Sequence, residues 1–283
     1  DVTASLRSLD RLGLLCALIP ELEESRGVEQ PKEHYWDVLE HCLETAGQVQ
    51  QVLCQLTESS SHLEMIPRFD TMETYFNETV SDGHRRKTLA VLSGLLHDVA
   101  KPATKTTEES GRVRFLGHHT EGARIAERVV RRLRLSSRGT ALVSDMVEHH
   151  LRPGQMAEPG KMPTNRAIYR YYRDVGDAAT STLYLNLADY LAARGPMLDV
   201  EDWSNRCQVI QHILQNKSPV SDVAKSALLN GYEIMDECSL PPGTRVGILL
   251  ELVREAEANG EISTKQDAIL LVKSILDNGG GGA

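Results

Sequence analysis

Histidine and aspartate residues stand in this chain where the adjoining apolar residues predict burial. His97 and Asp98 lie side by side at the end of an apolar run that begins at Leu89, and such a run predicts a buried helix. An ionisable pair buried there is unstable unless something compensates its charge. Imidazole nitrogen and carboxylate oxygen are both good ligands of divalent cations, so a bound metal ion is one such compensation. Pro102 then ends the helix, because proline lacks an N–H and disfavours helical geometry in the residue before it.

Another histidine lies on a helix that the apolar pattern predicts over residues 33–56. Leucine, valine and alanine recur there at spacings of three and four, which places them on one buried face. His34, Asp37 and His41 are spaced at i, i+3 and i+7 on that helix, so they share one stripe. Such a stripe can present a metal ligand with its supporting groups, although a single helical histidine is more often a hydrogen-bonded core residue.

Two further histidines lie at helix boundaries. His118 stands at or before the first turn of a predicted helix, where the chain can bring it to a site formed by the preceding helix. The apolar line of a helix predicted over 140–150 continues to His150, whereas His149 is rotated away from that line. His150 is therefore the better inward-pointing candidate.

An aspartate interrupts the apolar helix that we predict over residues 183–193. Asp189 is surrounded there by leucine and alanine residues, and a carboxylate in so apolar a segment needs a partner. A metal ion shared with His97 and Asp98 would supply that partner.

The composition narrows the classes of function. The 283 residues carry a formal net charge of −9, which suits a cytoplasmic protein and argues against general affinity for nucleic acid, so RNA binding requires a local basic patch. The five cysteines include no C-x-x-C pair, and neither a zinc knuckle nor a disulfide framework is indicated. The apolar run 12–19 is too short to span a bilayer and lacks a processing pattern, so we expect no membrane segment.

Helical patterns dominate the chain and predict an all-α fold. Turn residues at 109–111 between alternating arms predict one small β-hairpin near residues 104–115. We expect an N-terminal helical segment over 1–30, a central domain over 31–220 that holds the histidine and aspartate motifs, and a C-terminal helical region over 221–283 without a catalytic constellation.

Two arginine-rich segments could face RNA. Five arginines lie between positions 124 and 134 on the helix that follows His118, and the stretch 164–174 interleaves tyrosines with arginines, a composition that can stack bases and pair phosphates. A solvated charged face is the more frequent role of the first segment. An ordinary amphipathic helix with extended arginine side chains is the more frequent role of the second.

Taken together, the ordered motifs resemble the HD superfamily of metal-dependent phosphohydrolases. The closest resemblance is to the C-terminal HD region of bacterial CCA-adding enzymes and poly(A) polymerase-type tRNA nucleotidyltransferases. Nothing in these 283 residues resembles the nucleotidyltransferase head of those enzymes, so we do not assign CCA addition to them. The motifs are DVLEH at 37–41, LLHDVAKP at 95–102, FLGH at 115–118, HLRP at 150–153, LAD at 187–189 and PGTRVG at 242–247.

The resemblance implies an all-α HD fold and a set of metal ligands. One or two divalent ions are expected, and mixed nitrogen and oxygen ligation does not choose among Mn, Fe, Ni, Co, Zn and Mg. Asp98 would bridge the ions and take part in catalysis. Lys101 would bind and neutralise phosphoryl oxygens, with Arg152 and Arg194 as further substrate contacts. The implied ligands are His41, His97, Asp98 and Asp189 for one ion, and Asp98, His118 and His150 for the second.

The function that the resemblance implies is hydrolysis of a phosphate ester. The substrate would be a phosphorylated small molecule such as a nucleotide, or an RNA end such as a 2′,3′-cyclic phosphate. One alternative is a non-catalytic body that binds tRNA through the two arginine-rich segments. Another is a di-iron oxygenase that uses the same ligands to activate oxygen. Likeness of fold does not by itself choose among these functions.

Overall fold

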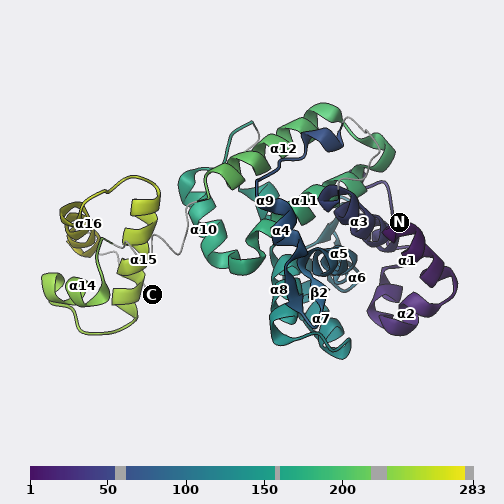
Figure 1. The fold of residues 1–283 in the computed structure, drawn as a ribbon, viewed down its shortest axis with the longest axis horizontal. Helices are drawn as coiled ribbons and strands as arrows, with labels where there is room; N and C mark the ends of the chain where they lie inside the picture. The colour runs from purple at the N-terminus through teal and green to yellow at the C-terminus, as the bar shows by residue number, and fades with distance from the viewer. Residues whose placement is uncertain (55–61, 157–159, 218–227, 278–283) are drawn as a thin grey trace. The chain divides into compact units, whose positions relative to one another are not determined.

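The computed structural model describes residues 1–54, 62–156, 160–217 and 228–277. It consists almost entirely of helices, with two small two-stranded sheets in the described part of the chain, so the predicted all-α fold is confirmed (Figure 1). The chain forms two compact units, each built from two segments. The first unit comprises residues 1–155 and 175–214, and the second comprises residues 156–174 and 215–283.

The first unit holds the candidate site. Its α-helices are α1 (Val2–Arg11), α2 (Leu14–Leu18), α3 (Val38–Leu53), α4 (Met72–Asn77), α5 (Arg86–Leu96), α6 (Lys101–Thr104), α7 (His118–Arg132), α8 (Ser137–His149), α9 (Arg152–Gln155), α11 (Ala179–Arg194) and α12 (Val200–Gln215). Its short 3₁₀ helices are η1 (Pro20–Ser25), η2 (Leu63–Met65), η3 (Gly176–Ala178) and η4 (Gly195–Met197).

Helix α11 lies at the centre of this unit. All residues from 179 to 188 are buried, because this stretch is rich in apolar and small residues on every side. Helix α11 packs against α3 and α5, while α5 also packs against α8, and α7 against α8 (Figure 1). The ends of these helices therefore meet at one place, where α11 reaches Asp189.

A glycine permits the close approach of α3 and α5. A Cβ atom built on Gly94 would lie 3.2 Å from the Ala46 Cα and 3.1 Å from a methyl group of Val49. A residue with a side chain would push the two helices apart. Since α3 carries His41 and His97 follows α5, this contact sets the spacing of the two histidines.

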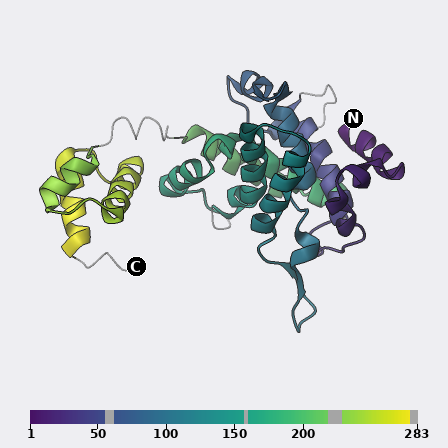
Figure 2. The same ribbon diagram turned by 90° about the horizontal axis from the view of Figure 1, so that it is seen from below.

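The predicted hairpin is present. Strand β3 (Lys105–Thr107) pairs with β4 (Val113–Phe115) in antiparallel register, and Gly111 between them has a φ of +80°. This is the left-handed region that glycine adopts without strain. Figure 2 shows the hairpin projecting from the helices of the first unit. A second small ribbon, β1 (Thr79–Ser81) with β2 (His84–Arg85), directly precedes α5.

Helix α3 begins later than the pattern predicts. Residues 33–37 are not helical, because Asp37 acts as the N-cap and its carboxylate accepts hydrogen bonds from the Glu40 N–H (2.8 Å) and the Gly27 N–H (3.0 Å). The prediction of a helical stripe from His34 to His41 is therefore wrong. Residues 55 and 56, at the predicted end, lie outside the described residues.

The second unit contains α10 (Asn165–Val175), α14 (Gly231–Cys238), α15 (Thr244–Ala258) and α16 (Lys265–Asp277). Apolar residues of α14, α15 and α16 form its core. Asn230 and Glu233 form a reciprocal capping box at the start of α14. In neither unit is a described helix long and apolar enough to cross a membrane.

Replacing Gly94 by valine should reduce the stability of the first unit, because the added side chain would clash with the backbone of α3. We expect the free energy of unfolding to fall by about 1–3 kcal/mol, as is usual for overpacked cores. Urea denaturation followed by circular dichroism measures this change. Thr88→Val, at an exposed position of the same helix, is the matched control. Equal losses in both variants would show that the close approach at Gly94 is unimportant.

Candidate metal centre

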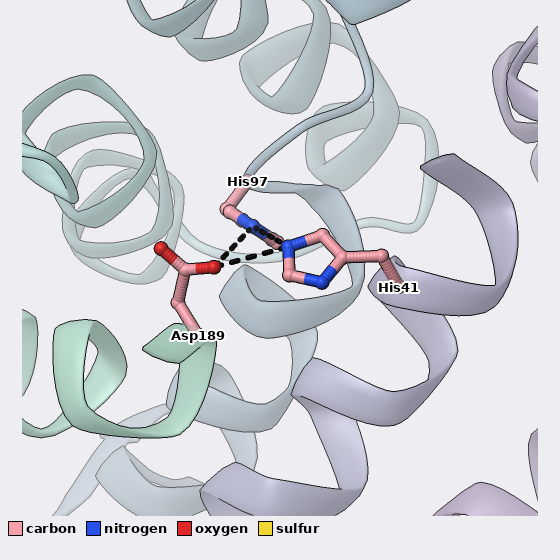
Figure 3. A group of neighbouring side chains, drawn as sticks. All are labelled: His41, His97 and Asp189. Atoms are coloured by element: carbon pink, nitrogen blue, oxygen red, sulfur yellow. Dashed lines mark hydrogen bonds and ion pairs between the residues drawn. The ribbon is translucent and has the colours of Figure 1, made fainter. Parts of the chain in front are cut away.

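Four predicted ligands meet at the centre of the first unit. Helix α3 supplies His41, the residues that follow α5 supply His97 and Asp98, and α11 supplies Asp189. Figure 3 shows the two imidazoles and the Asp189 carboxylate pointing toward one another from three separate elements. His41, His97 and Asp98 are fully buried, and the Asp189 side chain is 18% exposed.

The donor atoms of this group face each other at short distances. The Nε2 atoms of His41 and His97 lie 3.1 Å apart. The Asp189 Oδ1 atom lies 3.0 Å from the His41 Nε2 and 3.5 Å from the His97 Nε2. The Asp98 Oδ2 atom lies 3.3 Å and 3.1 Å from the same two nitrogens. Each of the two carboxylate oxygens thus faces the same pair of imidazole nitrogens.

The other oxygen of Asp98 faces a second pair of histidines. Its Oδ1 atom lies 3.3 Å from the His118 Nε2 and 3.7 Å from the His150 Nε2. Both histidines lie at helix boundaries, since α7 begins at His118 and His150 directly follows α8. Asp98 therefore stands between the two groups of donors, one oxygen toward each.

Backbone carbonyls fix the orientation of three of the imidazoles. The Nδ1–H groups of His97, His118 and His150 donate to the carbonyl oxygen three residues earlier, at 2.8, 2.6 and 2.7 Å. A carbonyl can only accept, so in each ring Nδ1 carries the hydrogen. The Nε2 atom of each ring is thereby directed toward the centre, which is the arrangement that orients histidine ligands in metal sites.

The spacing and the donor types fit a divalent cation. Ligands about 2.1 Å from an ion and at right angles to one another lie about 3.0 Å apart, and the donors around His41 and His97 are separated by 3.0 to 3.5 Å. The Asp98 Oδ1 and His118 Nε2 atoms are buried without a hydrogen-bond partner among the described residues. Such atoms are uncommon, and a bound ion is one physical reason for them.

Mutual charges set the ionisation of the centre. Burial lowers the pKa of His97, but the charge of Asp98 and hydrogen bonding to Asp189 outweigh burial and raise this pKa to about 10. Burial raises the pKa of Asp98, yet the charges of His97 and Lys101 bring it well below its ordinary value. Burial and then the charge of His97 lower the pKa of His150 to about 3. Without a metal ion, His97 therefore holds a proton at neutral pH.

Lys101 lies directly beside the predicted ligands. Its Nζ atom is 2.6 Å from the Asp98 Oδ2 and donates to the Gln30 side chain at 2.6 Å. The ammonium group also lies 5.5 Å from the centre of the Phe115 ring, on the hairpin side of the site. The lysine charge is thus held in place from three sides.

A cavity of about 930 Å³ adjoins the centre, a volume that accommodates a nucleotide-sized ligand. The hairpin, which joins α6 to α7 in the chain, forms one wall of this cavity and helps to enclose the site. The residues that line it include Gln30, His34, Asp98, Lys101, His118, His150, Asp189 and residues 111–117.

The predicted substrate contacts occupy different places. Arg194, at the end of α11, donates to the Glu33 carbonyl at 3.4 Å and lines a second, smaller cavity. Arg152 lies on α9 and is partly exposed. Of the described residues around the centre, Gln30, Asn186 and Arg206 were not predicted. His34 lies off α3, but its ring contacts the His41 ring with centroids 5.4 Å apart.

Residues of both arginine-rich segments form ion pairs, and those of the second also contribute to the core. On α7, Arg124, Arg131 and Arg132 form ion pairs with glutamates. On α10, the three tyrosines at 169, 171 and 172 are buried, so their rings are not exposed for stacking on bases. The α10 arginines at 166, 170 and 173 pair with Glu255 and Glu251 of α15. These segments behave as charged and amphipathic helix faces.

Comparison with known proteins places the site in a family. The profile described as "HD domain" matches residues 38–194, a span that includes all six predicted ligands. An A-adding tRNA nucleotidyltransferase of Deinococcus radiodurans is 29% identical over 275 residues, which are 96% of this chain and 54% of that protein. A CC-adding tRNA nucleotidyltransferase of Thermus thermophilus is 30% identical over 265 residues, 93% of this chain and 50% of that protein.

A bifunctional uridylyltransferase/uridylyl-removing enzyme of Ruegeria pomeroyi also matches. It is 30% identical over 188 residues, which are 66% of this chain and 18% of that protein. The chain spans about half the length of the two tRNA nucleotidyltransferases that it matches.

Metal binding should release about one proton per chain near neutral pH. The raised pKa of His97 leaves its Nε2 protonated in the metal-free chain, and a metal ligand must give up that proton. Calorimetric titration with Mn²⁺ in PIPES and in Tris, whose ionisation enthalpies differ, measures the number of protons released. A binding enthalpy that is the same in both buffers would contradict the proposed role of His97.

The two neighbouring histidines at the end of α8 should differ in their effect on metal content. His150→Ala removes a buried donor beside Asp98, so we expect the number of tightly bound Mn²⁺ ions to fall from two to one. His149→Ala, the matched control, should keep two. Loss of an ion in the His149 variant, or a single ion in the parent chain, would contradict the second site.

Proposed function

The chain belongs to the HD domain family, and on that premise we propose that it is a metal-dependent phosphohydrolase that acts on a nucleotide or on the phosphate at an RNA end. One observation supports the proposal above the others. The donor atoms of His41, His97, Asp98 and Asp189 converge at cation-ligand spacing beside a cavity of nucleotide size. Divalent ions held in such sites can catalyse the hydrolysis of phosphate esters.

The chain's own groups would prepare a substrate for attack. A bound divalent ion supplies a water of lowered pKa and neutralises phosphoryl charge. Lys101 adds a fixed positive charge at the edge of the cavity, where charge develops on the phosphoryl oxygens during in-line displacement. The Asp98 carboxylate forms an ion pair with Lys101 and also faces both groups of histidines. The same side chain would therefore position the lysine charge and serve as a metal ligand.

The chemistry named for the relatives agrees with a phosphodiester substrate. Two relatives act on tRNA by name, and a third removes uridylyl groups by name. A nucleotidyl group is attached through phosphorus, so its removal cleaves a phosphate ester. A 2′,3′-cyclic phosphate at an RNA end is the substrate that we propose.

Asp98→Ala should abolish hydrolysis. The substitution removes a candidate ligand oxygen from both groups of donors and leaves His118 and His150 without their carboxylate neighbour. Turnover of 2′,3′-cyclic AMP and of bis(p-nitrophenyl) phosphate, each with added Mn²⁺, Ni²⁺, Co²⁺ or Mg²⁺, measures this loss. Full activity in the variant would contradict the proposal. Turnover that requires O₂ or a reductant would instead identify the di-iron oxygenase.

Lys101→Met should lower kcat while metal is retained. Methionine matches the length of lysine without its charge, so the predicted ligands keep their places while the phosphoryl oxygens lose one positive neighbour. By analogy with the loss of one donor from a charge-stabilising site, we expect a fall in kcat of about 10²-fold. Steady-state kinetics with bis(p-nitrophenyl) phosphate measures it, and Lys87→Met on α5 serves as control. An equal kcat in both variants would show that Lys101 takes no part in the catalytic step.

A further inference from the structure

A smaller cavity of about 280 Å³ lies beside the metal centre, and we call it the side pocket. Two of its lining residues are arginines, Arg194 of α11 and Arg206 of α12. The side pocket and the main cavity share the lining residues Glu33, His34, Leu151, Gln155 and Asp189. A ligand bound at the metal centre can therefore extend past Asp189 into the side pocket.

Contacts on two sides hold the Arg206 guanidinium in place. Its Nη1 donates to the Asn186 Oδ1 at 3.1 Å. The guanidinium carbon lies 4.2 Å from the centre of the Tyr190 ring, and that ring stacks on the buried Trp203 with an angle of 13° between the planes. Arg194 lies 5.3 Å from the same Tyr190 ring. The side pocket thus presents two positioned cations around one aromatic ring.

The counter-charges of the side pocket lie at a distance, because Asp189 and Asp202 act on Arg206 without forming an ion pair with it. Among the described residues, neither Arg194 nor Arg206 forms an ion pair with a carboxylate, and the Arg206 Nε is buried without a hydrogen-bond partner. Burial lowers the pKa of Arg206, although the charge of Asp189 acts in the opposite direction. Once Asp189 binds a cation, that compensation is reduced. A partly buried guanidinium without a carboxylate partner is stabilised by an anionic ligand.

The lack of a side chain at Gly154 leaves room for the Arg206 guanidinium. A Cβ atom built on Gly154 would lie 3.1 Å from the Arg206 Nη1 and 3.7 Å from the Asn186 Nδ2. Glycine at position 154 therefore keeps a side chain from crowding the guanidinium. Guanidinium groups match phosphate in shape and charge, and they donate several hydrogen bonds from one plane.

We propose that the side pocket binds a second phosphate of the substrate, one that is not cleaved. The inference rests on the proposed function and makes it more specific. The substrate class is an oligonucleotide end, in which the terminal phosphate reaches the metal centre and the adjoining phosphodiester reaches Arg206 and Arg194. A mononucleotide with one phosphate fills only the first of these positions.

The kinetic test compares two substrates of the full chain. One is uridine 2′,3′-cyclic phosphate, which has one phosphate, and the other is uridylyl-uridine 2′,3′-cyclic phosphate, which has two. We expect kcat/KM to be at least about tenfold higher for the dinucleotide, equivalent to about 1.4 kcal/mol. Arg206→Gln keeps a donor for Asn186 and removes the charge, so it should reduce this preference to about one.

The ratio of kcat/KM for the two substrates distinguishes phosphate binding by Arg206 from a purely structural role of that residue. If Arg206 only supports Asn186 and the fold around it, Arg206→Gln lowers kcat/KM equally for both substrates, and the proposal is overturned. Arg128→Gln, an exposed arginine on α7, is the matched control and should keep the preference. Loss of the preference in this control variant would place RNA on the α7 face and would also overturn the proposal.

A binding measurement distinguishes failure of this inference from failure of the proposed function. In EDTA, where turnover is prevented, we expect the 3′-phosphorylated dinucleotide UpUp to bind at least about tenfold more tightly than uridine 3′-monophosphate, and Arg206→Gln to remove the difference. If UpUp binds more tightly in this way but neither cyclic phosphate is hydrolysed, the side pocket is retained and the phosphohydrolase activity is rejected. If a cyclic phosphate is hydrolysed but UpUp and uridine 3′-monophosphate bind equally tightly, the activity is retained and the side pocket is rejected.

Discussion

The close packing of α3, α5 and α11 is the constraint on which the candidate site depends, because it brings two imidazole Nε2 atoms and two carboxylates together in a buried space. His41 and His97 approach to 3.1 Å because Gly94 lets α3 and α5 pack closely. Charged groups removed from water are stable only when opposite charges and hydrogen bonds compensate them. The apolar packing around α11 imposes this proximity, so the stability of the core holds the centre together.

Several polar contacts determine how the centre is oriented. Carbonyl groups of the preceding helical turn fix the His97 and His150 rings. Asn186 donates to the His150 carbonyl at 2.9 Å and accepts from Arg206, so it joins the end of α8 to the side pocket. Gln30 holds Lys101 against Asp98. The metal centre, the cationic edge and the side pocket therefore share one hydrogen-bonded framework, and a change in one part affects the others.

The sequence was most informative where local pattern and chemistry coincide. The apolar helix ending in His97 and Asp98, the hairpin around Gly111 and the lone carboxylate at Asp189 could all be predicted, because each depends on residues adjacent in the chain. Helix periodicity also favoured His150 over His149, and His150 is the one buried beside Asp98.

The remaining features depend on tertiary packing. A regular apolar spacing did not reveal that Asp37 caps α3, which leaves His34 outside the helix. Gln30, Asn186 and Arg206 come from three segments distant in sequence, and no local spacing marks them as neighbours of the centre. The tyrosines of α10 could be assigned to a core or to a stacking surface only once their burial was known. Sequence pattern points to the candidate ligands better than to the groups that surround them.

The most direct test of the central claim is a crystal structure of the Mn²⁺-loaded chain with anomalous scattering recorded for manganese. The account predicts an anomalous peak about 2.2 Å from the Nε2 atoms of His41 and His97 and from the carboxylate oxygens of Asp98 and Asp189. A peak elsewhere on the molecule, or none at saturating Mn²⁺, would contradict the assignment of these residues as a metal centre.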